Sequence, residues 1–178
     1  LIKSARMIVS IYLGYIILGT IGYQIFGMSL FDAINHSISA VATGGFSTRA
    51  ESIGYYNHLG IEIVSMILMV LGGTNFFVHL LLIRAKFKLA FKHIELKFLG
   101  ILTLIFVPIF TLSLIQVNQT SFGQSLRHGT YHFLTTITTT GLQITPSVNA
   151  LPPTIIFITF ILMMIGAGMG STAGGMKL

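Results

Sequence analysis

Four stretches of the chain are apolar and long enough to cross a lipid bilayer, and they limit the possible folds more than any other feature. A helix needs roughly 20 residues to span a hydrocarbon layer of ~30 Å. The stretches cover 7–27, 58–83, 98–117 and 153–170. Of the 178 residues, 53% are hydrophobic and 8% are charged, with a mean hydropathy of +0.88. This balance predicts an all-α integral membrane protein.

Positive charges are distributed unevenly between these spans. One side carries only Arg49 and Arg127, and the other carries Lys3, Arg6, Arg84, Lys86, Lys88, Lys92, Lys97 and Lys177. By the positive-inside rule, both termini and the 84–97 loop are cytoplasmic, while the connections 28–57 and 118–152 face outside. We therefore expect a multi-pass protein of the plasma (inner) membrane. The net charge of +6 is explained by this topology and does not indicate nucleic-acid binding.

The two long external connections match one another. An offset of 96 residues aligns His36 with His132, Thr43 with Thr139, Gly45 with Gly141 and Phe46 with Leu142. The sequence ILMVLGG at 67–73 also resembles ILMMIGA at 161–167. We predict two tandem parallel repeats, 1–92 and 93–178, each built as helix, pore helix, filter loop and helix.

Each connection contains a Gly/Thr segment that suits neither a helix nor a strand. At membrane depth, unpaired backbone groups are costly unless protein, water or a bound ion satisfies them. Stacked carbonyls in such a loop can replace the hydration shell of a cation, and the C-terminal end of a preceding half-helix favours positive charge. The predicted ion-binding residues form a first filter loop, Ala42, Thr43, Gly44, Gly45 and Phe46, and a second filter loop, Thr138, Thr139, Thr140, Gly141 and Leu142.

These motifs resemble a known family. The sequences AVATGGFSTR, GGTNFF, TTITTTGLQ and GAGMGSTAGGMK are similar to the Trk/Ktr/HKT superfamily of potassium transporters across essentially the whole chain. The resemblance implies uptake of K⁺, or of Na⁺, through a pseudo-fourfold pore of four such units, of which this chain matches units two and three. It also implies that the chain is a fragment or joins a second copy, that the protein is a homodimer, and that a cytoplasmic ring of nucleotide-binding subunits regulates it.

The glycine-rich end, here called the Gly-rich loop (166–175), interrupts the fourth span. Five glycines in ten residues make a continuous helix unfavourable. The resemblance implies a gate beneath the filter formed by Gly166, Gly168, Gly170, Ser171, Thr172, Ala173, Gly174 and Gly175. Without the resemblance, close helix packing through Gly170 and Gly174 is the favoured interpretation.

Other functional classes predict different residues. A tandem-pore potassium channel needs Thr-x-Gly-Tyr/Phe-Gly twice, and Ser47 and Gln143 depart from that pattern. An intramembrane serine protease needs Ser171 beside a base such as His79, and a helical scaffold tolerates bulky residues in both filter loops. We expect no enzymatic activity and no cofactor, with K⁺ as the transported ion. The missing final glycines predict weaker discrimination between K⁺ and Na⁺.

Several charged or titratable residues have two interpretations. Glu62, inside the second span, suits either a structural role or cation attraction. Asp32 and Glu51 flank the first filter loop and either attract cations or lie in a solvated loop. For His36 and His132, packing or hydrogen bonding is favoured over a titrating sensor. The basic loop 84–97 suits anionic lipid or, by the resemblance, the regulatory ring.

Overall fold

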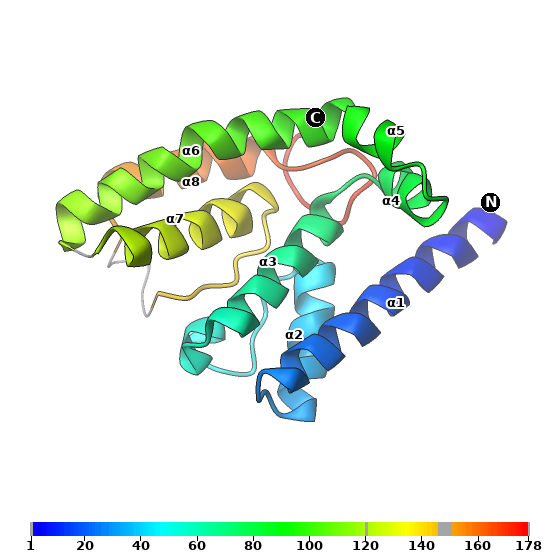
Figure 1. The fold of residues 1–178 in the computed structure, drawn as a ribbon, viewed down its shortest axis with the longest axis horizontal. Coiled ribbons are helices and arrows are strands. Elements are labelled where there is room, and N and C mark those ends of the chain that lie inside the picture. The colour runs from blue at the N-terminus through cyan, green and yellow to red at the C-terminus, as the bar shows by residue number, and fades with distance from the viewer. Residues whose placement is uncertain (1, 120, 146–150, 178) are drawn as a thin grey trace.

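The computed structural model describes residues 2–119, 121–145 and 151–177. Within these ranges it is helical and contains no strand, which confirms the predicted all-α class. Parts of the connection 118–152, at 120 and 146–150, lie outside the described residues. The α-helices, labelled in Figure 1, are α1 (Ile2–Ile25), α2 (Leu30–Val41), α3 (Leu59–Gly73), α4 (Phe76–Ile83), α5 (Phe87–Lys92), α6 (Ile94–Asn118), α7 (Phe122–Ile137) and α8 (Pro153–Ile165). A 3-10 helix, η1 (Ser52–Tyr56), lies between α2 and α3 in the sequence.

The helices form two similar groups. Figure 1 shows one group formed by α1, α2 and α3 and a second group formed by α6, α7 and α8. Helix α3 is the member of the first group that packs against the second, through α7. Each group has its own buried core, around Tyr23 and Met69 in the first and around Phe110 and Phe133 in the second. The first core also includes Tyr131 and Leu142 from the second group. The two groups are therefore packed together by the second filter loop and its pore helix.

The short helices α2 and α7 begin in the same way. Ser29 and Ser121 are the N-caps, both with φ −61° and ψ 152°. Each hydroxyl accepts a hydrogen bond from the backbone amide three residues later, at 3.1 Å and 3.4 Å, as is typical of an N-cap serine. The helices contain 12 and 16 residues, so the second is about one turn longer. Helices are thus present at both positions where pore helices were predicted.

The apolar spans are less regular than predicted. Two described helices, Ala5–Ile25 and Ile94–Val117, are long and apolar enough to cross a membrane, and a bent pair could form a third. The prediction of one continuous span over 58–83 is wrong, because the chain bends by 110° between α3 and α4. A separate helix, α4, begins after the bend because Asn75 caps it. The Asn75 side chain accepts a hydrogen bond from the amide of Phe77 over 2.8 Å.

The fourth span is also shorter than predicted. Helix α8 ends at Ile165, where Gly166 adopts φ +75°. The chain then turns back, and the amides of Met176 and Lys177 bond the carbonyls of Met164 and Ile165 at 2.9 Å and 3.2 Å. The expected interruption of this span is confirmed. Packing of Gly170 and Gly174 within a helix is wrong, because neither residue lies in one.

Candidate functional site

The two filter loops have the same unusual backbone. Thr43 and Thr139 have φ of +50° and +55°, and Gly45 and Gly141 have φ of +73° and +88°. A positive φ is rare for a β-branched residue, because its Cβ is crowded by the backbone. Strain at the same position in both loops indicates that the surrounding fold imposes this geometry twice.

The end of each pore helix binds its loop through amides. The amide of Gly44 donates to the Ser39 carbonyl over 2.8 Å, and that of Thr140 donates to the Thr135 carbonyl over 2.9 Å. Between described residues, no hydrogen bond is made to the six carbonyls that follow, those of Thr43, Gly44, Gly45, Thr139, Thr140 and Gly141. Unpaired carbonyls are the groups that can coordinate a dehydrated cation.

The two loops also face each other closely. A Cβ placed on Gly45 would collide with the carbonyl oxygen of Thr140, whereas a Cβ on Gly141 would lie 3.9 Å from the Gly45 Cα. Glycine is therefore required at position 45 for two reasons, its positive φ and the backbone opposite. At position 141 only the positive φ requires it.

The Gly-rich loop lies against the base of both filter loops. The Thr172 hydroxyl is 3.3 Å from the Thr43 hydroxyl, and the amide of Gly174 donates to the Thr139 hydroxyl over 2.6 Å. The Thr172 hydroxyl also lies 2.9 Å from the carbonyls of Val41 and Gly72. The structure thus brings together the two predicted filter loops and the predicted gate, which are distant in the sequence.

The residues proposed for a protease are not paired. The Ser171 hydroxyl donates to the Gly168 carbonyl over 2.6 Å, and His79 Nδ1 lies 2.9 Å from the hydroxyl of Tyr15. Between described residues there is no hydrogen bond from His79 to Ser171. The serine therefore lacks the base that would activate it.

A buried carboxylate holds the outer part of the first filter loop. Asp32 is 3% exposed and accepts hydrogen bonds from Thr48 at 2.6 Å, Arg49 at 2.8 Å and Tyr56 at 2.8 Å. The hydrogen bonds from Thr48 and Arg49 hold the pKa of Asp32 well below its usual range. Asp32 is thus neither solvated nor free to attract cations, contrary to both interpretations from the sequence.

The two histidines aligned by the repeat take the hydrogen-bonding role that was favoured. His36 Nδ1 is 2.7 Å from the Asp32 carbonyl, and its Nε2 is 2.8 Å from the Ser47 hydroxyl. His132 Nε2 is 3.1 Å from the hydroxyl of Thr159. The first histidine therefore fixes the end of its filter loop, while the second joins its pore helix to α8.

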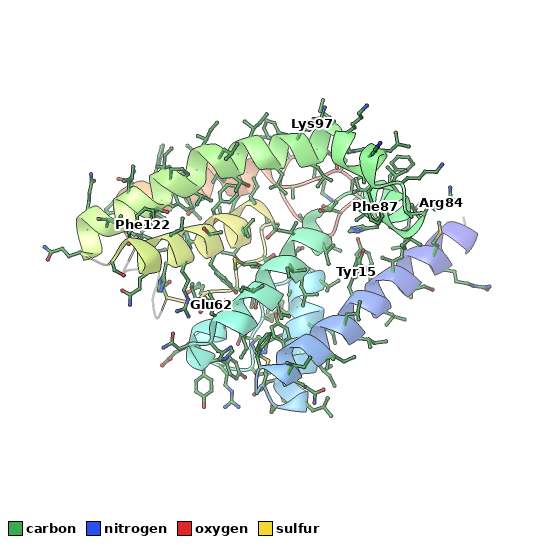
Figure 2. All side chains as sticks on the ribbon, in the orientation of Figure 1. Tyr15, Glu62, Arg84, Phe87, Lys97 and Phe122 are labelled. Atoms are coloured by element: carbon green, nitrogen blue, oxygen red, sulfur yellow. The ribbon has the colours of Figure 1, made fainter. Side chains whose placement is uncertain are left out.

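Glu62 forms an ion pair between the two groups of helices. Its carboxylate is 2% exposed and accepts from Arg127 Nε and Nη2, at 2.6 Å and 2.5 Å. Figure 2 labels Glu62 on α3, and Arg127 belongs to α7, the second pore helix. This pair supports the structural interpretation of Glu62. The sequence placed Arg127 on the external side but gave no indication of its partner, 65 residues away.

Comparison with known proteins shows similarity over the whole chain. The family model for TrkH, described as a cation transport protein, matches residues 1–178. The Trk system potassium uptake protein TrkH of Halomonas elongata is 30% identical over 99% of the chain, and TrkG of Escherichia coli is 31% identical over 94%. The crystal structure of the potassium transporter TrkH from Vibrio parahaemolyticus superimposes with a TM-score of 0.89, at 27% identity over 98% of the chain.

The match covers only part of each relative. The chain spans 36% and 35% of the two sequences and 38% of the solved structure. The chain thus corresponds to about a third of the length of each of these relatives.

Proposed function

The chain belongs to the TrkH family of cation transport proteins, and on that premise we propose that it forms part of a pore for the uptake of K⁺. The observation that carries the proposal is the pair of filter loops, which share a strained backbone, face each other and leave six carbonyls without donors among the described residues. The relatives named above are potassium uptake proteins. Transport requires no covalent step, so none is assigned to the chain.

The loop carbonyls would replace water around the ion. A dehydrated K⁺ is stabilised by several oxygen dipoles at once, and helices α2 and α7 end at the loops, so that their negative dipole ends add to this field. The matching positive φ values and the close approach of the two loops support ion binding by both, 42–46 and 138–142. Because Ser47 and Gln143 replace glycine, we expect fewer ion sites than in a potassium channel and weaker exclusion of Na⁺.

The Gly-rich loop would act as the gate. It is hydrogen-bonded to the base of both filter loops through Thr172 and Gly174, and an ion leaving the filter there must pass it. Its positive-φ glycines, at 166, 170 and 175, allow backbone changes that other residues resist. The proposed gate consists of Gly166, Gly168, Gly170, Ser171, Thr172, Ala173, Gly174 and Gly175.

The remainder of the pore would come from other units. We assign 1–92 and 93–178 to two of its repeats, with both ends of the segment and the loop 84–97 on the cytoplasmic side. The first pore helix and the filter loop that follows it leave apolar side chains exposed, namely Leu30, Phe31, Ile34, Ile38 and Phe46. Such a surface suits further pore repeats or a second copy. The basic loop 84–97 is the proposed contact for a nucleotide-binding regulatory ring.

The proposal is tested by ion flux. We would reconstitute the complete polypeptide that contains this chain into proteoliposomes and measure Rb⁺ and Na⁺ uptake, for the wild type and for Gly45→Asp. A preference for Rb⁺ that the substitution abolishes is the expected result. Gly123→Ala is the matched control, since a Cβ at Gly123 meets nothing within 4 Å. A correctly inserted wild-type protein that passes neither ion would refute the proposal.

A further inference from the structure

A buried carboxylate lies next to the Gly-rich loop. Glu95 is in the first turn of α6, and its side chain is 10% exposed. Oε1 accepts a hydrogen bond from the side-chain amide of Asn75 over 3.0 Å. Oε2 is buried and has no hydrogen-bond partner among the described residues. A buried polar oxygen without a partner is unfavourable, so its position requires an explanation.

The unpaired oxygen occupies the place of a missing side chain. A Cβ built on Gly168 would lie 2.6 Å from Glu95 Oε2. Gly168 is not among the glycines with positive φ, so its backbone would accept alanine. The carboxylate is thus the main obstacle to a side chain at position 168, and the absence of that side chain lets Glu95 contact the Gly-rich loop directly.

The hydrogen-bonded partner of Glu95 lies at the bend of the third span. Asn75 caps α4 immediately after the 110° bend. The next amide, that of Phe76, lies 3.4 Å from the carbonyl of Gly170, and the amide of Gly168 donates to the Gly73 carbonyl over 3.1 Å. One carboxylate therefore contacts the start of α6, the bend and the Gly-rich loop together.

A titratable side chain, His93, lies near this oxygen and would form an ion pair with it only when protonated. His93 Nδ1 is 4.0 Å from Oε2, too far for a hydrogen bond, and it too is buried without a partner among the described residues. A small cavity of about 20 Å³ adjoins the site and is lined by Glu95, Gly168 and apolar residues of α6. Displacement of the loop would give both groups access to water, which favours release once the contact is broken.

We propose that Glu95 is a positioning residue that latches the Gly-rich loop beneath the filter loops and so restrains conduction. The latch consists of its bond to Asn75 and its contact with Gly168. This inference rests on the proposed role of the loop as a gate. It assigns Glu95 an effect on the rate of ion passage and none on ion selectivity, because the latch does not touch the filter loops.

The test uses the complete polypeptide in proteoliposomes. We expect Glu95→Ala, which removes the charge-assisted hydrogen bond to Asn75, to raise Rb⁺ flux by about tenfold. Gly168→Ala should raise it by a similar factor, because the new Cβ displaces the carboxylate from the loop. The double variant should exceed neither single variant, because both remove one contact. Glu95→Gln keeps an oxygen for Asn75 and should stay within about twofold of the wild type. Gly100→Ala is the matched control on α6, where a Cβ meets nothing within 4 Å.

The outcomes separate this inference from the proposed function. The ratio of Rb⁺ to Na⁺ should be the same in all variants, which a general loss of structure would not preserve. Unchanged or reduced flux in Glu95→Ala, or multiplying effects in the double variant, would overturn the latch while leaving the pore intact. A wild type that passes no Rb⁺ refutes the pore itself.

Discussion

The two filter loops have one backbone geometry but are held in place by different means. In the first, the exit is clamped by polar side chains, with Ser47 bound to His36 and Arg49 bound to Asp32. Phe46, the last residue of this loop, is 81% exposed. In the second, the corresponding Leu142 is fully buried, and the amide of Gln143 donates to the Ser52 hydroxyl of η1 over 3.1 Å. The exit of the first loop is thus fixed within its own repeat, and the exit of the second loop is fixed by the neighbouring repeat.

This difference shows which features an ion-binding loop requires. The positive φ values at Thr43, Thr139, Gly45 and Gly141 are common to both loops, so the direction of the carbonyls depends on them. The supporting contacts differ, because a repeated unit meets different neighbours in its two positions. Substitutions at equivalent positions should therefore have unequal effects.

The largest difference is expected at the two central glycines. In Gly45→Ala the new Cβ meets the backbone carbonyl of Thr140, which cannot move aside as a side chain would, and Rb⁺ uptake should fall to background. In Gly141→Ala only the positive φ is unfavourable, at ~1–2 kcal/mol, so a reduction of about tenfold is expected. Uptake is measured in proteoliposomes with matched protein content. Equal losses would contradict the close approach of the loops.

The second-largest effect is expected from breaking the ion pair between Glu62 and Arg127, which should lower the stability of the protein. Arg127→Ala leaves the Glu62 carboxylate buried and unpaired, which typically costs about 3–5 kcal/mol. The double substitution Glu62→Gln with Arg127→Gln leaves no buried charge and should cost less. The measurement is thermal unfolding of detergent-solubilised protein. If Arg127→Ala is no less stable than the double variant, the pair does not join the second pore helix to α3 as described.

The polar clamp makes the first loop sensitive to acid through a buried carboxylate, which the second loop lacks at the matching position. The pKa of Asp32 is lower in the folded protein than its ordinary value of 3.8, so its contribution to stability is complete above that value and is lost as the pH falls toward the folded pKa. The equivalent position in the second loop is His128. We expect Asp32→Asn to lower the melting temperature at pH 7, with the difference from wild type shrinking below about pH 4. A difference that is constant with pH would rule out a charged Asp32.

The sequence was sufficient for the features that depend on composition and repetition. Hydropathy predicted the helical class, and the match of Thr43 to Thr139 and of Gly45 to Gly141 located two loops that have the same geometry in the structure. These features are local, since glycine, threonine and a capped half-helix specify the backbone within a few residues. The break in the fourth span followed in the same way from its glycine content.

Contacts between distant segments could not be predicted. The 110° bend after α3 depends on the Asn75 cap and on the Gly-rich loop that bonds the carbonyls of Gly72 and Gly73, and hydropathy reports neither. The pairing of Glu62 with Arg127 likewise needs the packing of α3 on α7. Asp32 was interpreted as a surface charge, because nothing in the sequence shows that Thr48, Arg49 and Tyr56 converge on it.

The smallest expected effects have opposite signs in the two loops. Thr135 supports the second loop by accepting the amide of Gly141 over 3.0 Å. Its equivalent in the first loop, Ser39, has a buried hydroxyl with no partner among the described residues. Thr135→Val should therefore destabilise the protein by about 1–2 kcal/mol, since it leaves an amide unpaired. Ser39→Ala removes an unsatisfied group and should be neutral or slightly stabilising.

Thermal unfolding of the two variants, measured side by side with the ratio of Rb⁺ to Na⁺ uptake, checks this last prediction. Thr135→Val should also weaken the preference for Rb⁺, because the amide of Gly141 orients the carbonyls on either side of it, whereas Ser39→Ala should leave the preference unchanged. A comparable loss from Ser39→Ala would mean that its hydroxyl supports the first loop in the membrane as Thr135 supports the second. The two loops would then be equivalent in their support as well as in their backbone.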